Sequence, residues 1–290
     1  MKETTKPHPE MDFDPPSRDF AKQFIKPFKR YFTPEFHGIE EVDAARPALF
    51  VSNHAVIGVL DGYPFAIELY IQKGIFLRAL ADRRHFQIPL WRDLLEKKLG
   101  ALEASRVNCG KVMERGESLL VFPGGTREVC KKKGEAYELK WQDRTGFVRM
   151  AMQYGYDIIP VAAVGAEDAY DVVKDSNDIL ENSWAGKLLK QTGLAHSVFK
   201  DGELLPPFVR GFGNTILPKP VKLYFSFGKR ISTKKYKSLY EDAETQELIK
   251  SKVELALLKQ FKQLFDIREN DKGNNVVKRF VDVVLSKESD

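Results

Sequence analysis

The sequence contains only two cysteines, Cys109 and Cys130, in 290 residues. Neither has the Cys-x-x-Cys or Cys/His spacing that a zinc site or a redox motif requires, so we expect two reduced thiols and no bound metal. The chain also lacks a run of about 18 uncharged apolar residues, the length that a membrane-spanning helix needs. The N-terminal residues lack the apolar segment of a signal peptide. These absences predict a cytoplasmic protein without a transmembrane helix.

Several well-known functional motifs are missing too. No Gly-x-Ser-x-Gly elbow occurs, which disfavours a serine hydrolase. Gly211-Phe-Gly213 lacks the third glycine of a dinucleotide fingerprint, and no segment matches the phosphate-binding loop that ends in Gly-Lys-Ser/Thr. The basic residues are scattered and give a formal net charge of +5. We therefore expect no nucleic-acid partner, whereas phospholipid headgroups or coenzyme A phosphates fit this mild basic charge.

Apolar residues make up 43% of the chain, which is enough for a sizeable core. Short apolar runs typical of strands alternate with segments whose apolar residues recur every three or four positions, as in helices. This alternation predicts an α/β fold with a mostly parallel central sheet flanked by helices. The predicted strands are residues 47–52, 75–81, 118–122, 158–164 and 222–227, and the predicted helices between them are 62–72, 89–99, 106–114 and 145–154.

The two ends of the chain predict additions to this core. Residues 1–16 are charged and proline-rich, which predicts a disordered tail. The remainder, 17–290, is predicted to be a single domain with helical additions at both ends. Its predicted parts are an amphipathic N-terminal segment at 17–35, a catalytic core at 47–230, a long irregular loop or lid within that core at 183–220, and C-terminal helices at 240–286, namely 241–265 and 276–285.

His54 follows the predicted strand 47–52, and Asp61 comes seven residues after it. On one continuous helix the two would lie ~10.5 Å apart along the axis, too far for a hydrogen bond. A turn near Gly58 would instead place Asp61 at the start of the next helix, within reach of the imidazole. His54 would then be a general base oriented by a carboxylate. The alternative is a structural histidine at the strand end and a plain helix N-cap.

A glycine turn follows the predicted strand 118–122. Gly124 and Gly125 can expose backbone N–H groups, and Arg127 adds a planar donor suited to phosphate or carboxylate. The alternative is a tight turn with a solvated Arg127 and Glu128. Since ligands bind at the carboxyl ends of parallel strands, we expect this turn and His54 to converge on one edge of the sheet.

These segments resemble the four ordered sequence blocks of the glycerolipid and lysophosphatidic acid acyltransferases. The third block departs from the usual Phe-Pro-Glu-Gly-Thr-Arg-Ser, because Gly124 replaces the Glu and Glu128 replaces the Ser. In this respect it looks more like the diacylglycerol acyltransferase and phytyl-ester synthase branches. The matching residues are Asn53, His54 and Asp61 in the first block, Gly100 through Arg106 in the second, Phe122 through Glu128 in the third, and Ile159, Pro160 and Val161 in the fourth.

The resemblance implies an O-acyltransferase of lipid metabolism, such as phospholipid biosynthesis, that needs no cofactor. Acyl-CoA or an acyl carrier protein would supply the acyl group to a glycerolipid, a lysophospholipid or a long-chain alcohol. His54 and Asp61 would be catalytic, and the acceptor and donor would be bound by Arg106, Gly124, Gly125, Thr126, Arg127 and Glu128. Six residues separate His54 from Asp61, where the family usually has four. This gap favours the alternative, a catalytically silent lipid-binding or membrane-scaffold protein with the same fold.

Lipid acceptors require contact with a membrane, and we expect peripheral association. Residues 20–32 place a phenylalanine at every fourth position beside lysines and an arginine, a composition typical of an interfacial amphipathic helix. The alternative is a helix docked on the core, and Pro27 would kink it or begin a second helix. Residues 204–213 form a second candidate contact. Lys131-Lys-Lys133 could meet coenzyme A phosphates or simply be solvated, and Arg83, Arg84 and His85 could line the cleft or cap a turn.

Overall fold

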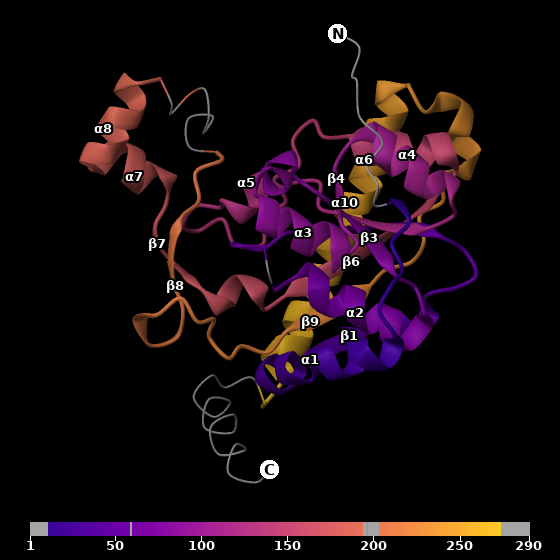
Figure 1. Cartoon of the computed structure of the whole chain (residues 1–290), viewed down its shortest axis with the longest axis horizontal. Helices are drawn as coiled ribbons and strands as arrows, with labels where there is room; N and C mark the ends of the chain where they lie inside the picture. Colours follow the sequence, from indigo (N-terminus) through magenta and orange to yellow (C-terminus); the bar gives the residue numbers. More distant parts are fainter. Residues whose placement is uncertain (1–10, 59, 194–195, 197–202, 274–290) are drawn as a thin grey trace.

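The computed structural model describes residues 11–58, 60–193, 196 and 203–273 (Figure 1). Within them, a seven-stranded sheet has the order β1-β9-β6-β2-β5-β3-β4. Neighbouring strands are parallel except β6 and β9, which are antiparallel. The predicted α/β fold with a mostly parallel sheet is therefore confirmed. The strands are β1 (Glu35–His37), β2 (Ala48–Ser52), β3 (Leu77–Ala81), β4 (Leu102–Glu103), β5 (Ser118–Val121), β6 (Asp157–Val164) and β9 (Tyr224–Phe227).

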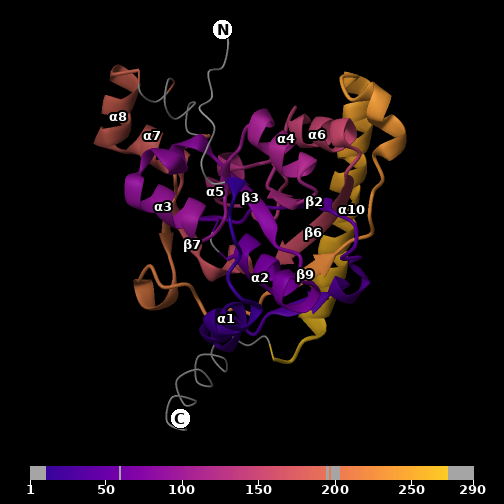
Figure 2. The ribbon, with the colours of Figure 1, turned by 45° about the vertical axis from the view of Figure 1, so that its right-hand side comes forward.

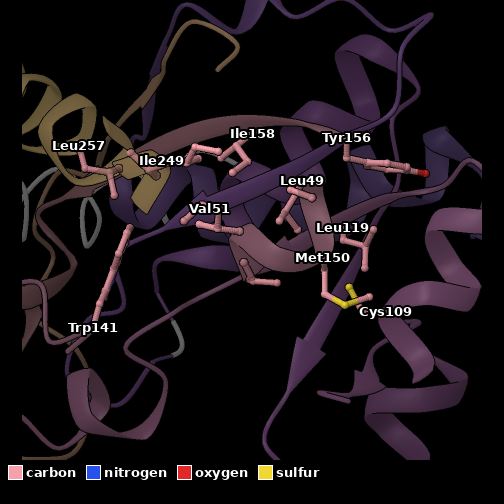
Figure 3. Close-up of a cluster of buried hydrophobic side chains, with 14 of the residues drawn as sticks. Leu49, Val51, Cys109, Leu119, Trp141, Met150, Tyr156, Ile158, Ile249 and Leu257 are labelled. Atoms are coloured by element: carbon pink, nitrogen blue, oxygen red, sulfur yellow. The ribbon is translucent and has the colours of Figure 1, made fainter. Parts of the chain in front are cut away.

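Helices cover both faces of the sheet, and the alternating side chains of β2 explain why. Leu49 and Val51 point into one core, which is completed by α4, α6 and α10 (Figure 3). Ala48 and Phe50 point into the opposite core, against α1 and α2. Since both faces are buried, β2 is apolar from Ala48 to Val51 and ends in the buried Ser52. The helices around the sheet are α1 (Arg18–Phe32), α2 (Gly62–Lys73), α3 (Pro89–Lys97), α4 (Arg106–Glu114), α5 (Thr126–Val129), α6 (Gly146–Tyr154) and α10 (Ala243–Asn270).

Residues 183–220, predicted to be a long irregular loop, contain regular structure. Strand β8 (Phe208–Arg210) pairs in antiparallel fashion with β7 (Asp171–Lys174). This small sheet supports α7 (Ser176–Asn182) and α8 (Trp184–Gln191), which extend away from the central sheet in both views (Figures 1 and 2). The prediction missed these elements because each is short, and β8 pairs with a strand more than 30 residues earlier in the chain.

The ends of the chain differ in part from the predictions. Residues 11–16 belong to the predicted disordered tail, yet Phe13 stacks on Phe76 at a ring distance of 5.2 Å and lies beside the Arg78 guanidinium. This part of the tail therefore packs on the domain. The predicted helix 276–285 lies outside the described residues, as do residues 1–10. No helix in the described part of the chain is both long and apolar enough to cross a membrane.

Helix α1 combines the two alternatives that its sequence left open. Pro27 lies inside one continuous helix, on its exposed side. Ile25 and Phe32 are buried against the core, whereas Phe20 and Phe24 are 57% and 62% exposed. The helix is therefore docked on the domain and also presents two aromatic side chains outward.

Candidate active site

Asn53 fixes the point where the chain leaves β2. Its side-chain amide donates to the carbonyl of Ala163 at 3.1 Å, and its side-chain oxygen accepts from the N–H of Ala163 at 2.9 Å. Ala163 belongs to the neighbouring strand β6. The side chain of Asn53 therefore makes the pair of hydrogen bonds that another backbone residue of β2 would make with β6. The backbone at His54 is thereby released from the sheet at its carboxyl edge.

The turn that the sequence requires between His54 and Asp61 is present. Ile57 and Gly58 both have left-handed backbone, with φ of 70° and 66°. The N–H of Gly58 donates to the carbonyl of Ala55 at 2.9 Å. The chain consequently reverses, and Nδ1 of His54 lies 2.6 Å from Oδ2 of Asp61. A six-residue gap thus allows direct contact between the two side chains.

Asp61 is held rigidly at the start of α2. Its Oδ1 accepts from the N–H of Gly62 at 2.7 Å, and its Oδ2 accepts from the N–H of Ala55 at 2.6 Å. The side chain is only 1% exposed. Although burial opposes ionisation, His54 and these hydrogen bonds hold the pKa of Asp61 below its ordinary value. Asp61 is therefore a carboxylate at neutral pH.

The His54 ring is oriented by its neighbours. Burial favours its neutral form, but the Asp61 carboxylate outweighs burial and raises the pKa of His54. The ring stacks on Phe122 with centroids 4.0 Å apart. Nδ1 faces Asp61, and the opposite edge of the ring lies against Gly58, where a Cβ would be 2.7 Å from Cε1 and 2.9 Å from Nε2. The His54 side chain is 17% exposed, so the ring is not fully closed off from solvent.

The glycine turn lies beside His54, and each of its two positions is a glycine for a different structural reason. A Cβ on Gly124 would lie 2.3 Å from the carboxyl carbon of Glu128, so no side chain fits there. Gly125 has a φ of 50°, and its N–H donates to the carbonyl of Phe122 at 2.9 Å. This N–H closes the turn and is not free to bind an oxyanion. Arg144 supports the turn by donating to the Gly124 carbonyl at 2.8 Å.

Glu128 is inside the protein rather than on the surface that a substrate would contact. Its side chain is 0% exposed. One carboxylate oxygen accepts from the N–H of His54 at 2.6 Å, and the other accepts from the N–H of Lys140 at 2.9 Å. Burial raises the pKa of Glu128. Direct substrate binding by Glu128 is therefore not supported, because both its oxygens bind backbone groups.

The other predicted binding residues lie at the same edge. Arg127 is 16% exposed and pairs with Glu203 at 2.8 Å. The Thr126 hydroxyl accepts from Arg84 at 2.8 Å, which joins the turn after β3 to this site. Arg106 is exposed at the first position of α4, after β4. Since β5 and β3 lie between β2 and β4 in the sheet, Arg106 is separated from the group around His54.

The sequence did not predict that the side chain of Lys131 is buried. Lys131 belongs to a run of three lysines, which is typical of solvated surface, yet its side chain is 0% exposed. The ammonium group donates to Glu167 at 2.5 Å and to the carbonyl of His54 at 3.1 Å. Only the apolar residues just before the run, Val129 and Cys130, signal that the first lysine points inward.

The described residues contain no group of three or more His, Cys, Asp or Glu side chains that could hold a metal ion. Cys109 and Cys130 are both free and buried. Burial raises the pKa of Cys109 to about 12 and that of Cys130 to about 11. Both thiols are therefore protonated at neutral pH and unsuited to act as nucleophiles.

Comparison with known proteins shows which proteins this chain is similar to. Residues 33–164 match the family model described as Acyltransferase. The chain is 31% identical over 234 residues to phytyl ester synthase 2 of Arabidopsis thaliana, a match that covers 74% of this chain and 32% of that protein. It is 34% identical over 127 residues to the "DGAT1/2-independent enzyme synthesizing storage lipids" of Bos taurus, covering 44% of this chain and 37% of that protein.

A solved structure, the 1-acyl-sn-glycerophosphate acyltransferase PlsC from Thermotoga maritima, is also similar. The TM-score is 0.42 with 19% sequence identity, over 82% of this chain and 80% of that one. The chain spans about a third of the length of the phytyl ester synthase and storage-lipid relatives that it matches.

Proposed function

We propose that the chain is an O-acyltransferase that uses His54 and Asp61, which lie within residues 33–164, the region that matches the Acyltransferase family model. The observation that carries the proposal is the 2.6 Å contact between Nδ1 of His54 and Oδ2 of Asp61 inside that region. The contact fixes one tautomer, in which Nδ1 carries the proton and Nε2 is a free base. The closed contact favours catalysis over the alternative of a silent lipid-binding protein.

In the proposed reaction, Nε2 of His54 accepts the proton of an acceptor hydroxyl while that oxygen attacks the carbonyl carbon of an acyl thioester. The tetrahedral intermediate then collapses to an ester and releases a thiolate. The thiolate takes the proton from the imidazolium, which restores neutral His54. The thioester belongs to acyl-CoA or an acyl carrier protein, and no covalent acyl-enzyme forms.

Cationic side chains at the same edge supply positive charge. Arg127 lies on the glycine turn, and Arg84 contacts this turn through the Thr126 hydroxyl. Guanidinium groups suit a developing oxyanion. Because the Gly125 N–H is used within the turn, these side chains, rather than that backbone group, would stabilise negative charge.

We propose that the acceptor is a neutral alcohol rather than a phosphorylated glycerol. Arg127, the residue of the third block suited to a phosphate, is already paired with Glu203 at 2.8 Å. A phosphate would have to displace this carboxylate and would be repelled by it. The names of the relatives point the same way, since they concern phytyl esters and storage lipids. A long-chain alcohol or a diacylglycerol fits this description.

Access to such acceptors requires a lipid surface. Helix α1 exposes Phe20 and Phe24 beside Lys22 and Lys26, which are also exposed. Aromatic side chains flanked by lysines are typical of peripheral helices that lie at a membrane interface. We propose that this face of α1 makes the membrane contact, with Phe208 as a second exposed aromatic at the other predicted surface.

The direct test is an acyl-transfer assay of the purified chain with acyl-CoA and acyl carrier protein donors. Lysophospholipids, diacylglycerol and long-chain alcohols are offered as acceptors. We expect ester formation with neutral alcohols and a loss of about 10² to 10⁴ in rate for His54→Ala. His37→Ala is the matched control, since His37 lies on β1 at the edge of the sheet. Unchanged turnover in a folded His54→Ala variant would refute the mechanism.

A further inference from the structure

Buried charged side chains hold the backbone of His54 on both sides. The N–H of His54 donates to Glu128 at 2.6 Å, and its carbonyl accepts from Lys131 at 3.1 Å. Glu128 and Lys131 are each 0% exposed. Glu128 lies on α5, and Lys131 follows this helix, so a single short segment reaches both peptide groups that flank the histidine.

A second layer holds these two side chains in turn. Lys131 donates to Glu167 at 2.5 Å, and Glu167 also accepts from the N–H of Val56 at 3.3 Å. Glu128 uses its remaining oxygen for the N–H of Lys140. Buried charges of this kind are costly to desolvate, and well-packed apolar residues would stabilise the fold at least as well. These buried side chains converge on the backbone of one histidine and of the loop that follows it.

The two departures from the family's third block are linked in this arrangement. A Cβ on Gly124 would overlap the side chain of Glu128, at 2.3 Å from its carboxyl carbon. Glycine at 124 therefore provides the space that the carboxylate at 128 occupies under His54. The two residues form one structural unit.

We infer that Glu128 and Lys131 are positioning residues for the active site, which fix the peptide groups before and after His54 so that Nδ1 faces Asp61. For the acyl-transfer reaction this inference rests on the proposed function. The orientation itself is a property of the folded chain and can be measured without turnover. Rigid support of this kind matters because a displacement of about 1 Å can cost on the order of 10²-fold in rate.

The charges around His54 make the inference separable from a purely structural role. Asp61 contacts the ring from the N-cap of α2. Glu128 and Lys131 contact the N–H and the carbonyl of His54 from α5 and the residues after it. Glu167 pairs with Lys131, and His85 lies on the turn after β3. Glu128 raises the pKa of His54, whereas Lys131 lowers it. Removing one or the other should move this pKa in opposite directions.

The experiment is an NMR titration of ¹³C-labelled histidine in the full chain, with the His54 signal assigned from a His54→Gln variant. We expect Lys131→Met to raise the pKa of His54 and Glu128→Gln to lower it. In the assay, both variants should lose on the order of 10- to 100-fold in kcat with KM unchanged, and Lys131→Arg should recover most of this loss. If neither variant moves the His54 titration, the inference is overturned.

Gly124→Ala provides a second variant that leaves every charge in place, should Lys131→Met not fold. Its Cβ would push the Glu128 carboxylate away from the His54 N–H, so we expect a lower His54 pKa, as in Glu128→Gln. Gly146→Ala is the matched control, because a Cβ there meets nothing within 4 Å. A Gly124→Ala titration equal to wild type would count against the inference. If the wild-type chain proves inactive, the proposed function fails, but the titrations still decide the positioning roles.

Discussion

Nδ1 of His54 contacts Oδ2 of Asp61 at 2.6 Å across six intervening residues. The longer loop does not weaken the contact, because Ile57 and Gly58 turn back through left-handed backbone and the N–H of Ile57 donates to Val129 on α5 at 3.4 Å. The loop is thereby attached to the same helix that supplies Glu128.

Asp61→Asn should reduce kcat by about 10³ to 10⁴ while leaving the fold intact. Asparagine can still cap α2, but its amide group would favour the wrong tautomer of His54, as in other histidine–carboxylate pairs. Steady-state kinetics with a neutral alcohol acceptor, together with thermal unfolding, would measure both effects. A folded Asp61→Asn variant with near-normal kcat would show that Asp61 is only a helix cap.

Activity should rise with pH through the pKa of His54. The base must be neutral, and its pKa lies above the ordinary 6.5, so the acid limb of the kcat profile should fall above pH 6.5. The contribution of His54 to the free energy of unfolding should change in the opposite direction and decrease as pH rises. A raised pKa in the folded state stabilises the fold fully below about pH 6.5, and this contribution is lost as pH rises through the folded pKa.

Thermal unfolding of the wild-type chain and His54→Gln across this range would measure the stability effect. The difference between their free energies of unfolding should be largest at the acidic end of this pH range. Asp61 contributes in the opposite sense, since its lowered pKa gives stability above about pH 3.8 that is lost as pH falls further. A His54-dependent stability that grew between pH 6.5 and 8 would contradict the expected sign.

Gly58→Ala should reduce kcat by more than its loss of stability explains. The new Cβ would lie 2.9 Å from Nε2 of His54, where an acceptor hydroxyl must approach. It would also strain a backbone with φ of 66°, at a cost of about 1 to 2 kcal/mol. Gly74→Ala carries the same strain at φ of 72° but meets nothing within 4 Å. Equal kinetic losses in the two variants would mean that strain alone is responsible.

Glu203→Gln should improve the use of phosphorylated acceptors. The change leaves Arg127 without its carboxylate partner, so a lysophosphatidate should show a lower KM while a long-chain alcohol is little affected. The expected change is on the order of tenfold, the value of a charge-assisted contact of about 1.4 kcal/mol. Glu241→Gln is a control that removes an exposed surface carboxylate paired with Arg149 instead. The same response in both variants would assign the effect to net charge.

The sequence predicted β2, β5 and β6 because each is a mostly apolar run that is buried on both faces. It predicted the turn at Gly58 because Asp61 was otherwise out of reach. It did not predict the inward direction of Lys131 or Glu128. Both lie in a charged stretch with no periodicity, and their burial depends on acceptors and donors far along the chain, such as Glu167 and the N–H of His54. Contacts of this kind are decided by tertiary structure rather than by local pattern.

Phe24→Asp should weaken membrane binding without destabilising the domain. Phe24 is 62% exposed on α1, while the neighbouring Ile25 is buried and docks the helix. Replacing the ring removes apolar area from the face that we propose contacts lipid, and the added charge is repelled by anionic headgroups. Flotation with vesicles that contain anionic phospholipid would measure the bound fraction, which we expect to fall severalfold.

Gln23→Asp is the matched control, because Gln23 is exposed on the same helix and the change adds the same charge without removing an aromatic ring. Phe208→Asp tests the second surface in the same way, since Phe208 is 63% exposed on β8. Loss of flotation in Phe24→Asp alone would assign the contact to α1. If both aromatic variants float like the wild-type chain, neither surface binds the membrane, and the acceptor must reach His54 by another route.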